Sequence, residues 1–177
     1  MDITRLTLPP LGLYLHLPWC VQKCPYCDFN SHALRGELPE QEYAAAILKD
    51  IPIEAARADQ RPLTSIFIGG GTPSLFNAST IGHLLEQLEK HIPFAKDIEI
   101  TLEANPGTTE ATRFRGFLAA GVNRLSIGAQ SFNDAHLKAL GRIHDGNAAI
   151  DAIKTAQSVG FERINVDLMH GLPEQTL

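Results

Sequence analysis

The stretch Leu11-Gly-Leu-Tyr-Leu-His-Leu17-Pro-Trp-Cys20-Val-Gln-Lys-Cys24-Pro-Tyr-Cys27 decides the fold, because a strand runs directly into a group of cysteines. Leucines at alternate positions from 11 to 17 predict a β-strand with one apolar face and one polar face. The cysteines follow in a C-x3-C-x2-C spacing, and the chain has 3 cysteines in total. No thiol is therefore left over for a structural disulfide or for a four-cysteine zinc site.

Three thiolates on one loop can bind three irons of a cubane [4Fe–4S] cluster and leave the fourth iron open to a ligand. Zinc is an alternative, and its fourth ligand would come from His16 or His32, since structural zinc is four-coordinate. A redox pair of Cys24 and Cys27 is a second alternative, but it gives Cys20 no function. The spacing favours the cluster because the array lacks the distant second pair of ligands that zinc fingers have.

Four more strand-like runs follow, at 65–69, 97–103, 123–128 and 163–169, and helical patterns separate them. The helical stripes contain Ile81, Leu84, Leu85 and Leu88; Phe114, Phe117 and Leu118, ending at Gly121; and Ala149, Ala152, Ile153 and Ala156, ending at Gly160. We expect a kink or a break at Pro52 in a helix that begins near Glu40. Repeated βα units predict an α/β fold with five parallel strands.

The strands alternate instead of being apolar throughout, as strands buried on both faces usually are. Glu99, Thr101 and Glu103 oppose isoleucines and a leucine, and later strands place Ser126 and Asp167 in the same way. A polar face of this kind predicts a roomy, incomplete barrel around a polar ligand, since filled barrels carry bulky branched side chains inside. The alternative is an open sheet whose second face is solvated or covered by another domain.

Residues suited to a ligand follow the strands at their carboxyl ends, where parallel α/β folds bind ligands. They are the cysteine loop, the run Gly69-Gly-Gly-Thr-Pro73, and then Glu103, Gln130 and Asp167. Each polar residue alone fits a cap, a turn or a solvated surface, and a glycine run also serves plain tight turns. Their joint placement at one end of one sheet predicts a binding site.

Composition excludes several classes of function. A net charge of −5 gives no general attraction to nucleic acid, and no apolar run is long enough to cross a membrane. The N-terminus, Met-Asp-Ile-Thr-Arg, lacks the layout of a signal peptide. Cysteines that cluster for a metal and occur nowhere else fit a reducing compartment, so we expect a cytoplasmic protein.

The chain resembles the radical S-adenosylmethionine superfamily. Within it, the chain is similar to the branch of oxygen-independent coproporphyrinogen III dehydrogenases and HemW-like haem chaperones. The motifs that carry the resemblance are Tyr14-Leu-His-Leu-Pro-Trp-Cys20, the cysteine loop continuing as Asp28-Phe29-Asn30, Gly69-Gly-Gly-Thr-Pro-Ser, Glu103-Ala-Asn-Pro, Gly128-Ala-Gln-Ser-Phe and Asp167-Leu-Met-His-Gly-Leu-Pro. The fold that it implies is a partial (β/α)6-type barrel. Since only five strands are present, we expect residues 1–177 to be the N-terminal part of this core domain.

The resemblance implies a [4Fe–4S] cluster on Cys20, Cys24 and Cys27, with the amino and carboxylate groups of S-adenosylmethionine on the open iron. Gly70, Gly71 and Thr72 would line the methionine end. Four further positions match residues that contact the cofactor in this branch: Glu103, Gln130, Arg142 and Asp167. Tyr14 is expected to lie close to the cluster. Arg142 suits a carboxylate because a guanidinium can donate two parallel hydrogen bonds.

Two departures from the dehydrogenase pattern favour a carrier over an enzyme. Phe29 stands where the dehydrogenase is expected to have a further cysteine. The dehydrogenase is also expected to have a longer segment before its first cysteine than the 19 residues that precede Cys20 here. The resemblance then implies a protein that binds haem as cargo and delivers it to haem-requiring respiratory enzymes, meeting membranes only through those recipients. His16 and His170 are the first candidates for an axial ligand. The alternatives are radical decarboxylation of coproporphyrinogen and a zinc-binding structural module.

Overall fold

A computed structural model describes residues 8–107, 110–172 and 174–176 of the chain. The N-terminal residues 1–7, on which the signal-peptide argument rests, lie outside the described part, and so does Pro173, the last residue of a quoted motif. None of the helices in the described ranges combines the length and the apolarity that crossing a membrane requires.

A five-stranded parallel sheet organises the molecule, and all five predicted strands are confirmed. Its spatial order is β1-β4-β5-β6-β7, so each strand pairs with the one preceding it in that series. The bounds are β1 Leu11–Leu17, β4 Leu63–Gly70, β5 Phe94–Ala104, β6 Arg124–Gln130 and β7 Arg163–Leu168. A sheet wound in one direction in this way is one part of a barrel wall.

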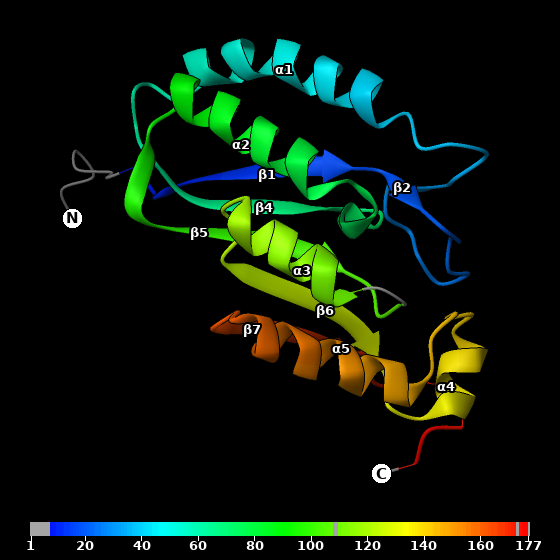
Figure 1. Ribbon diagram of the computed structural model, residues 1–177. Coiled ribbons are helices and arrows are strands. Elements are labelled where there is room, and N and C mark those ends of the chain that lie inside the picture. Colours follow the sequence, from blue (N-terminus) through cyan, green and yellow to red (C-terminus); the bar gives the residue numbers. More distant parts are fainter. Residues whose placement is uncertain (1–7, 108–109, 173, 177) are drawn as a thin grey trace, which may run out of the picture.

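Helices cover one face of this sheet (Figure 1). The long helices are α1 Glu40–Arg57, α2 Ala78–His91, α3 Glu110–Ala119 and α5 Gly146–Val159, and each packs against the next in this order. The short elements η1 Pro73–Leu75 and α4 Asp134–Ala139 lie in loops that follow β4 and β6. Gly160 ends α5 in the left-handed conformation, with φ 109°, as predicted from its position.

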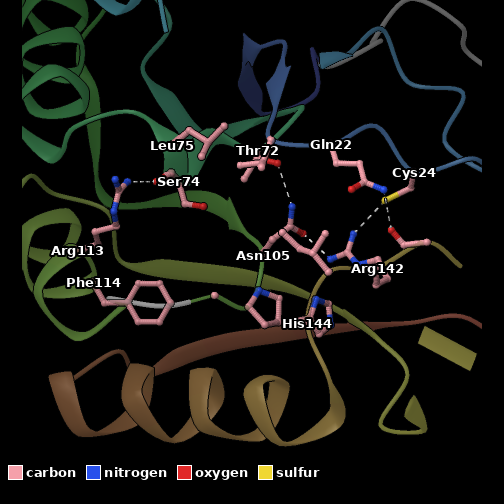
Figure 2. A pocket seen from close by; sticks show the side chains of 15 residues that line it. Gln22, Cys24, Thr72, Ser74, Leu75, Asn105, Arg113, Phe114, Arg142 and His144 are labelled. Atoms are coloured by element: carbon pink, nitrogen blue, oxygen red, sulfur yellow. Dashed lines mark hydrogen bonds between the residues drawn. The ribbon is translucent and has the colours of Figure 1, made fainter. Parts of the chain in front are cut away.

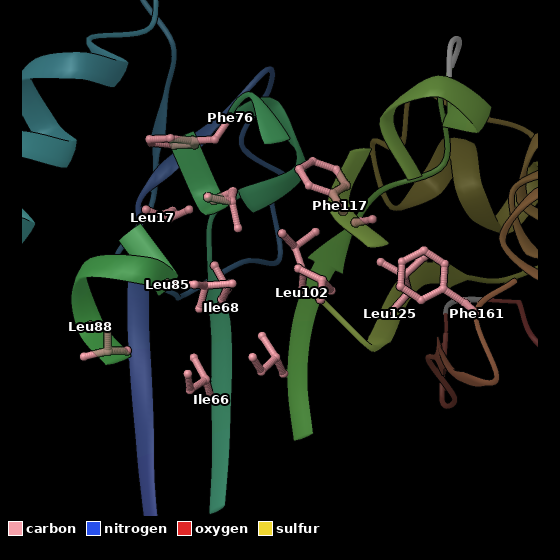
Figure 3. Packing of buried hydrophobic residues seen from close by; sticks show 14 of the residues in the cluster. Leu17, Ile66, Ile68, Phe76, Leu85, Leu88, Leu102, Phe117, Leu125 and Phe161 are labelled. Atoms are coloured by element: carbon pink, nitrogen blue, oxygen red, sulfur yellow. The ribbon is translucent and has the colours of Figure 1, made fainter. Parts of the chain in front are cut away.

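The core forms between the helices and the apolar face of the sheet (Figure 3). Alternate residues of the strands, such as Ile68, Leu102 and Leu125, are each 0% exposed, as predicted from the alternation. Phe117 of α3 and Phe76 after η1 fill the space above them and are also 0% exposed. Burying each such side chain contributes about 1.5–3 kcal/mol, so this face accounts for most of the stability of the fold.

Of the two outcomes expected at Pro52, a kink or a break, the structure contradicts the break, because α1 continues through it from Glu40 to Arg57, and the kink stays a prediction. Proline removes a single backbone hydrogen bond, the one that would reach Leu48. The neighbouring Ile51 is 7% exposed and belongs to the core. Packing of α1 on α2 therefore outweighs the local preference of the proline.

Two very short strands bracket the cysteine loop and were not predicted. β2 Trp19–Cys20 and β3 His32–Ala33 form a parallel pair apart from the main sheet. Strands of two residues have no periodicity, so no sequence pattern marks them. Their pairing closes the cysteine loop at its base.

Candidate functional site

A cavity of about 410 Å³ opens at the carboxyl edge of the sheet and brings the predicted site residues together, with the exception of Tyr14. Its lining includes Cys20, Cys24, Cys27, Gly70, Gly71, Thr72, Glu103, Gln130, Arg142 and Asp167, together with Gln22, Tyr26, Phe29, Ala104, Asn105, Ser126, Gly128 and Met169. The cysteine loop therefore faces the polar ends of four strands. This juxtaposition was the central prediction of the sequence.

Backbone contacts hold the cysteine loop in shape. The N–H of Leu34 donates to Cys20 O at 2.8 Å, and the N–H of Cys27 donates to Cys24 O at 3.0 Å. Lys23 adds a brace by donating from Nζ to the carbonyls of Phe29 and Ser31, each at 3.1 Å. All three cysteines are free thiols and partly exposed, so they are available as ligands.

The donor set suits a cubane cluster better than zinc. In the described residues, no three side chains of His, Cys, Asp or Glu are arranged to hold a single ion. A cubane takes one thiolate per iron, so its sulfur ligands do not have to meet at a single point. A zinc site would need a fourth converging ligand, but Nε2 of His16 bonds to Asn30 O at 2.8 Å and its Nδ1 bonds to the Tyr14 hydroxyl at 3.2 Å. The other candidate, His32, is exposed.

The glycine run packs against the start of the cysteine loop. The N–H groups of Gly71 and Thr72 donate to Leu17 O at 2.8 Å and to Trp19 O at 2.7 Å. A Cβ at Gly71 would lie 2.5 Å from Trp19 O, so only glycine permits this approach of two backbones. The run thus fixes the cysteine loop relative to β4, in addition to lining the cavity.

Side chains from separate segments at the carboxyl edge form a connected wall beside Cys24 (Figure 2). Asn105 Nδ2 donates to Thr72 Oγ1 at 2.9 Å, and Arg142 Nη2 donates to Asn105 Oδ1 at 2.7 Å. Arg142 also donates from Nη1 to Cys24 Sγ at 3.6 Å and from Nη2 to Gly128 O at 2.6 Å. Gly128 leaves room for this convergence, because a Cβ there would lie 2.9 Å from Asn105 Oδ1. The wall places a guanidinium next to the thiols.

The carboxylates of Glu103 on β5 and Asp167 on β7 complete the polar lining of the cavity. Glu103 Oε2 accepts from the Gly70 N–H at 3.1 Å. Burial raises the pKa of Glu103, the hydrogen bond from Gly70 lowers it, and the negative charge of Asp167 raises it again. Asp167 is oriented by Ser126, whose Oγ lies 3.3 Å from each carboxylate oxygen, and by Asn165 Nδ2 at 2.6 Å from Oδ1.

Gln130 reaches the cavity from a strained turn. Its φ is 65°, and the Ser131 N–H donates to Ala129 O at 2.8 Å across it, which closes a three-residue turn. Such a turn with a positive central φ is rare, and a non-glycine residue in it costs about 1–3 kcal/mol. The pairing of β6 with β7 shifts register at this point. The strained backbone therefore lies at a residue, Gln130, that lines the cavity.

Sequence reasoning did not identify three residues of this network: Asn105, Ser126 and His144. Asn105 lies inside a quoted motif and Ser126 on the predicted polar face, so both had a signal that could have marked them. His144 had none, because its hydrogen bond to Ala129 O at 3.1 Å joins a loop to a strand.

Tyr14 lies on the open face but does not line the cavity of the cysteines. Its ring stacks on Phe67 with centroids 6.1 Å apart, and it is 57% exposed. Burial and the charge of Glu103 raise its pKa. Its expected closeness to a cluster stays a prediction.

The model of the radical SAM superfamily matches residues 14–177, which include the cysteine loop and every strand end described above. The chain belongs to the radical SAM superfamily. The core of the superfamily explains the partial barrel, the cysteine array and the cavity at the carboxyl edge as parts of one arrangement.

Within this radical SAM family the chain is similar to curated haem chaperones. It is 57% identical to the heme chaperone HemW of Haemophilus influenzae and 55% identical to that of Escherichia coli, in each case over 96% of this chain. The chain spans 45% of the length of these relatives. Among solved structures, it resembles the radical SAM enzyme coproporphyrinogen III oxidase (HemN) of Escherichia coli, with a TM-score of 0.84 and 33% identity over 94% of this chain and 38% of that one.

Proposed function

We propose that the protein is a haem chaperone that holds a [4Fe–4S] cluster and S-adenosylmethionine in this radical SAM site. The observation that carries the proposal is the 57% identity to a heme chaperone over 96% of the chain, against 33% to the coproporphyrinogen oxidase. The recipients that we propose are haem-requiring respiratory enzymes, and nucleic acid is not a partner. Cytoplasmic location and the role of residues 1–177 as the N-terminal part of the core stay predictions.

The described residues can bind both cofactors. Cys20, Cys24 and Cys27 would ligate the cluster, which when bound supplies an open iron and a transferable electron. Arg142, next to Cys24, would attract the carboxylate of S-adenosylmethionine through its positive charge and an Nη1 hydrogen, because Nη2 is already engaged by Asn105 and Gly128. Glu103 and Asp167, which also line the cavity, would offer acceptor oxygens to amino and hydroxyl groups of the ligand.

A specific observation keeps oxidation of coproporphyrinogen as a second candidate. The fold matches that of HemN with a TM-score of 0.84 over 94% of this chain. At the position where the dehydrogenase is expected to have a further cysteine, Phe29 places an apolar ring on the rim that is 62% exposed. A surface of that kind suits a flat apolar cargo better than a further metal ligand.

The test is anaerobic reconstitution with iron and sulfide, followed by two assays on the same preparation. Titration with haem should give saturable binding, seen as a shift of the Soret band. Incubation with coproporphyrinogen, S-adenosylmethionine and a reductant should give no decarboxylated product. Turnover of coproporphyrinogen would overturn the chaperone proposal in favour of the oxidase.

The histidine that would contact haem stays a prediction. Both ring nitrogens of His16 are engaged by neighbours, whereas His170 follows β7 and is exposed. Replacement of His170 by alanine should therefore change the Soret spectrum more than replacement of His16. Equal spectra for both variants would remove both residues from consideration.

A further inference from the structure

His144 occupies a buried position beside the site that no step above uses. It lies in the loop between α4 and α5, two residues after Arg142, and is 8% exposed. Its Nε2 is 3.1 Å from Ala129 O, and since a carbonyl only accepts, Nε2 carries the hydrogen. Nδ1 is then the bare nitrogen, and it is buried without a hydrogen-bond partner in the described part of the chain.

The carbonyl that His144 contacts is the acceptor of the strained turn at Gln130. Ala129 O receives the Ser131 N–H at 2.8 Å and the imidazole N–H at 3.1 Å. The first bond closes the turn and the second holds its acceptor in place. The side chain of Gln130 depends on this geometry to reach the cavity.

The same loop is fastened to β6 at a second, adjacent point. Arg142 Nη2 donates to Gly128 O at 2.6 Å, and His144 donates to the carbonyl of the next residue. Two residues of one loop thus bind two consecutive carbonyls at the end of one strand. The clamp fixes Arg142 and Gln130 relative to one another across the site.

A purely structural role does not explain an imidazole at this position. An apolar side chain of similar size would fill the space without burying an unpartnered nitrogen. Burial lowers the pKa of His144, which disfavours the charged form of the ring. What distinguishes histidine from leucine here is the N–H directed at Ala129 O.

We infer that His144 is a positioning residue that clamps the turn at Gln130, so that Gln130 and Arg142 face the same cavity. The inference deepens the proposed function, and only its affinity arm rests on S-adenosylmethionine being the ligand of that cavity.

The test compares His144→Leu, which keeps the buried volume, with His144→Gln, whose amide can still donate to Ala129 O. Exchange of the Ser131 amide with deuterium reports on the turn without any cofactor. Titration calorimetry of the reconstituted protein with S-adenosylmethionine reports on the site. His83→Leu, at an exposed position on α2, is the matched control.

His144→Leu should speed exchange of the Ser131 amide about tenfold and weaken S-adenosylmethionine binding about tenfold, with an unchanged or higher melting temperature and equal cluster content. His144→Gln should recover most of both losses. Unchanged exchange in His144→Leu would overturn the inference. So would a fall in melting temperature that accompanies the loss of affinity and is not rescued by glutamine. If the unaltered protein binds no S-adenosylmethionine, the proposed function fails, while the exchange arm still tests the clamp.

Discussion

The two faces of the sheet are built on different principles. Toward the helices, side chains such as Ile68 and Leu125 are 0% exposed and interchangeable in kind, because any well-packed aliphatic residue could serve there. On the open face and at its carboxyl edge, the chain carries a positive φ at Gln130, a partly buried carboxyl at Glu103 and, in His144, a buried nitrogen that has no hydrogen-bond partner among the described residues. The packed side chains of the first face stabilise the fold, whereas the strained backbone and the buried polar groups of the second face lower its stability. Substitutions on the two faces should therefore separate folding from binding.

The largest expected effect on the open face is the loss of the cluster in Cys24→Ala. Removing one of the three thiolates should abolish the brown [4Fe–4S] absorption after anaerobic reconstitution, while the loop stays in place through its backbone bonds. Iron content and visible absorption measure this outcome. Gln22→Ala, in the same loop but without a thiol, is the control and should keep its iron. An intact cluster in Cys24→Ala would refute the assignment of ligands.

On the helical face, Phe117→Ala should have the largest effect on stability. Phe117 is 0% exposed, so the cavity left behind should lower the free energy of unfolding by about 3–5 kcal/mol. Urea unfolding followed by circular dichroism measures the change. Ile150→Ala, at a position on α5 that is 38% exposed, should stay within about 0.5 kcal/mol. Cluster content per folded molecule should not change in either variant, and a selective loss in Phe117→Ala would blur the contrast between the faces.

Glu103→Gln should raise stability and weaken binding together. The folded-state pKa of Glu103 is raised above its ordinary value of 4.5, so the folded state holds the proton more tightly than the unfolded state. Its contribution to stability is therefore full below 4.5 and is lost as the pH rises through the folded pKa. The glutamine variant lacks this loss and should gain stability relative to the parent on the alkaline side.

The same substitution removes a charged acceptor, which should weaken S-adenosylmethionine binding about tenfold or more. Urea unfolding across a pH series and titration calorimetry measure the two effects. Glu89→Gln, exposed on α2, should change neither quantity. If the free energies of unfolding of the parent and the variant depended on pH in the same way, ionisation of Glu103 would have no effect on stability.

The smallest effect concerns the helix that follows the site. Asp145 caps α5 by accepting from the Ala148 N–H at 2.7 Å, and Asp145→Ala should lower the free energy of unfolding by about 1 kcal/mol. Asp151→Ala, exposed within the same helix, should cost less than half of that. Thermal unfolding measures both. A loss of S-adenosylmethionine affinity in Asp145→Ala beyond this small change would mean that the cap also supports the clamp made by Arg142 and His144.

The sequence was sufficient for the parts of the molecule that repeat. Alternation marked the apolar face of four of the five strands, because burial of one face imposes a period of two, although Leu168, which was assigned to that face of β7, is 58% exposed. The joint placement of cysteines, Glu103 and Asp167 followed from the rule that parallel strands end at one edge. The break that was one of two outcomes expected at Pro52 does not occur, because the local preference of proline competes with the packing of α1 on α2.

What could not be predicted consists of single contacts between distant segments. The bond from His144 to Ala129 O and the positive φ of Gln130 leave no trace in composition or periodicity. Tyr14 lies on the predicted polar face of β1, and its closeness to a cluster stays a prediction. It lies three residues before the end of β1, which at about 3.3 Å per residue is roughly 10 Å below the edge where the cysteines begin.

The wall of Thr72, Asn105 and Arg142 has one more consequence. Thr72 follows β4, Asn105 follows β5, and Arg142, in the loop between α4 and α5, is anchored to Gly128 of β6, so the members of the wall are held at the ends of three consecutive strands. Neighbouring strands are about 4.8 Å apart, a distance that the backbone ladder sets regardless of side chains. The spacing of the strands therefore sets the distances between the groups of the wall. Loops around the pocket can change in length while the distances between these ligand-facing groups stay constant.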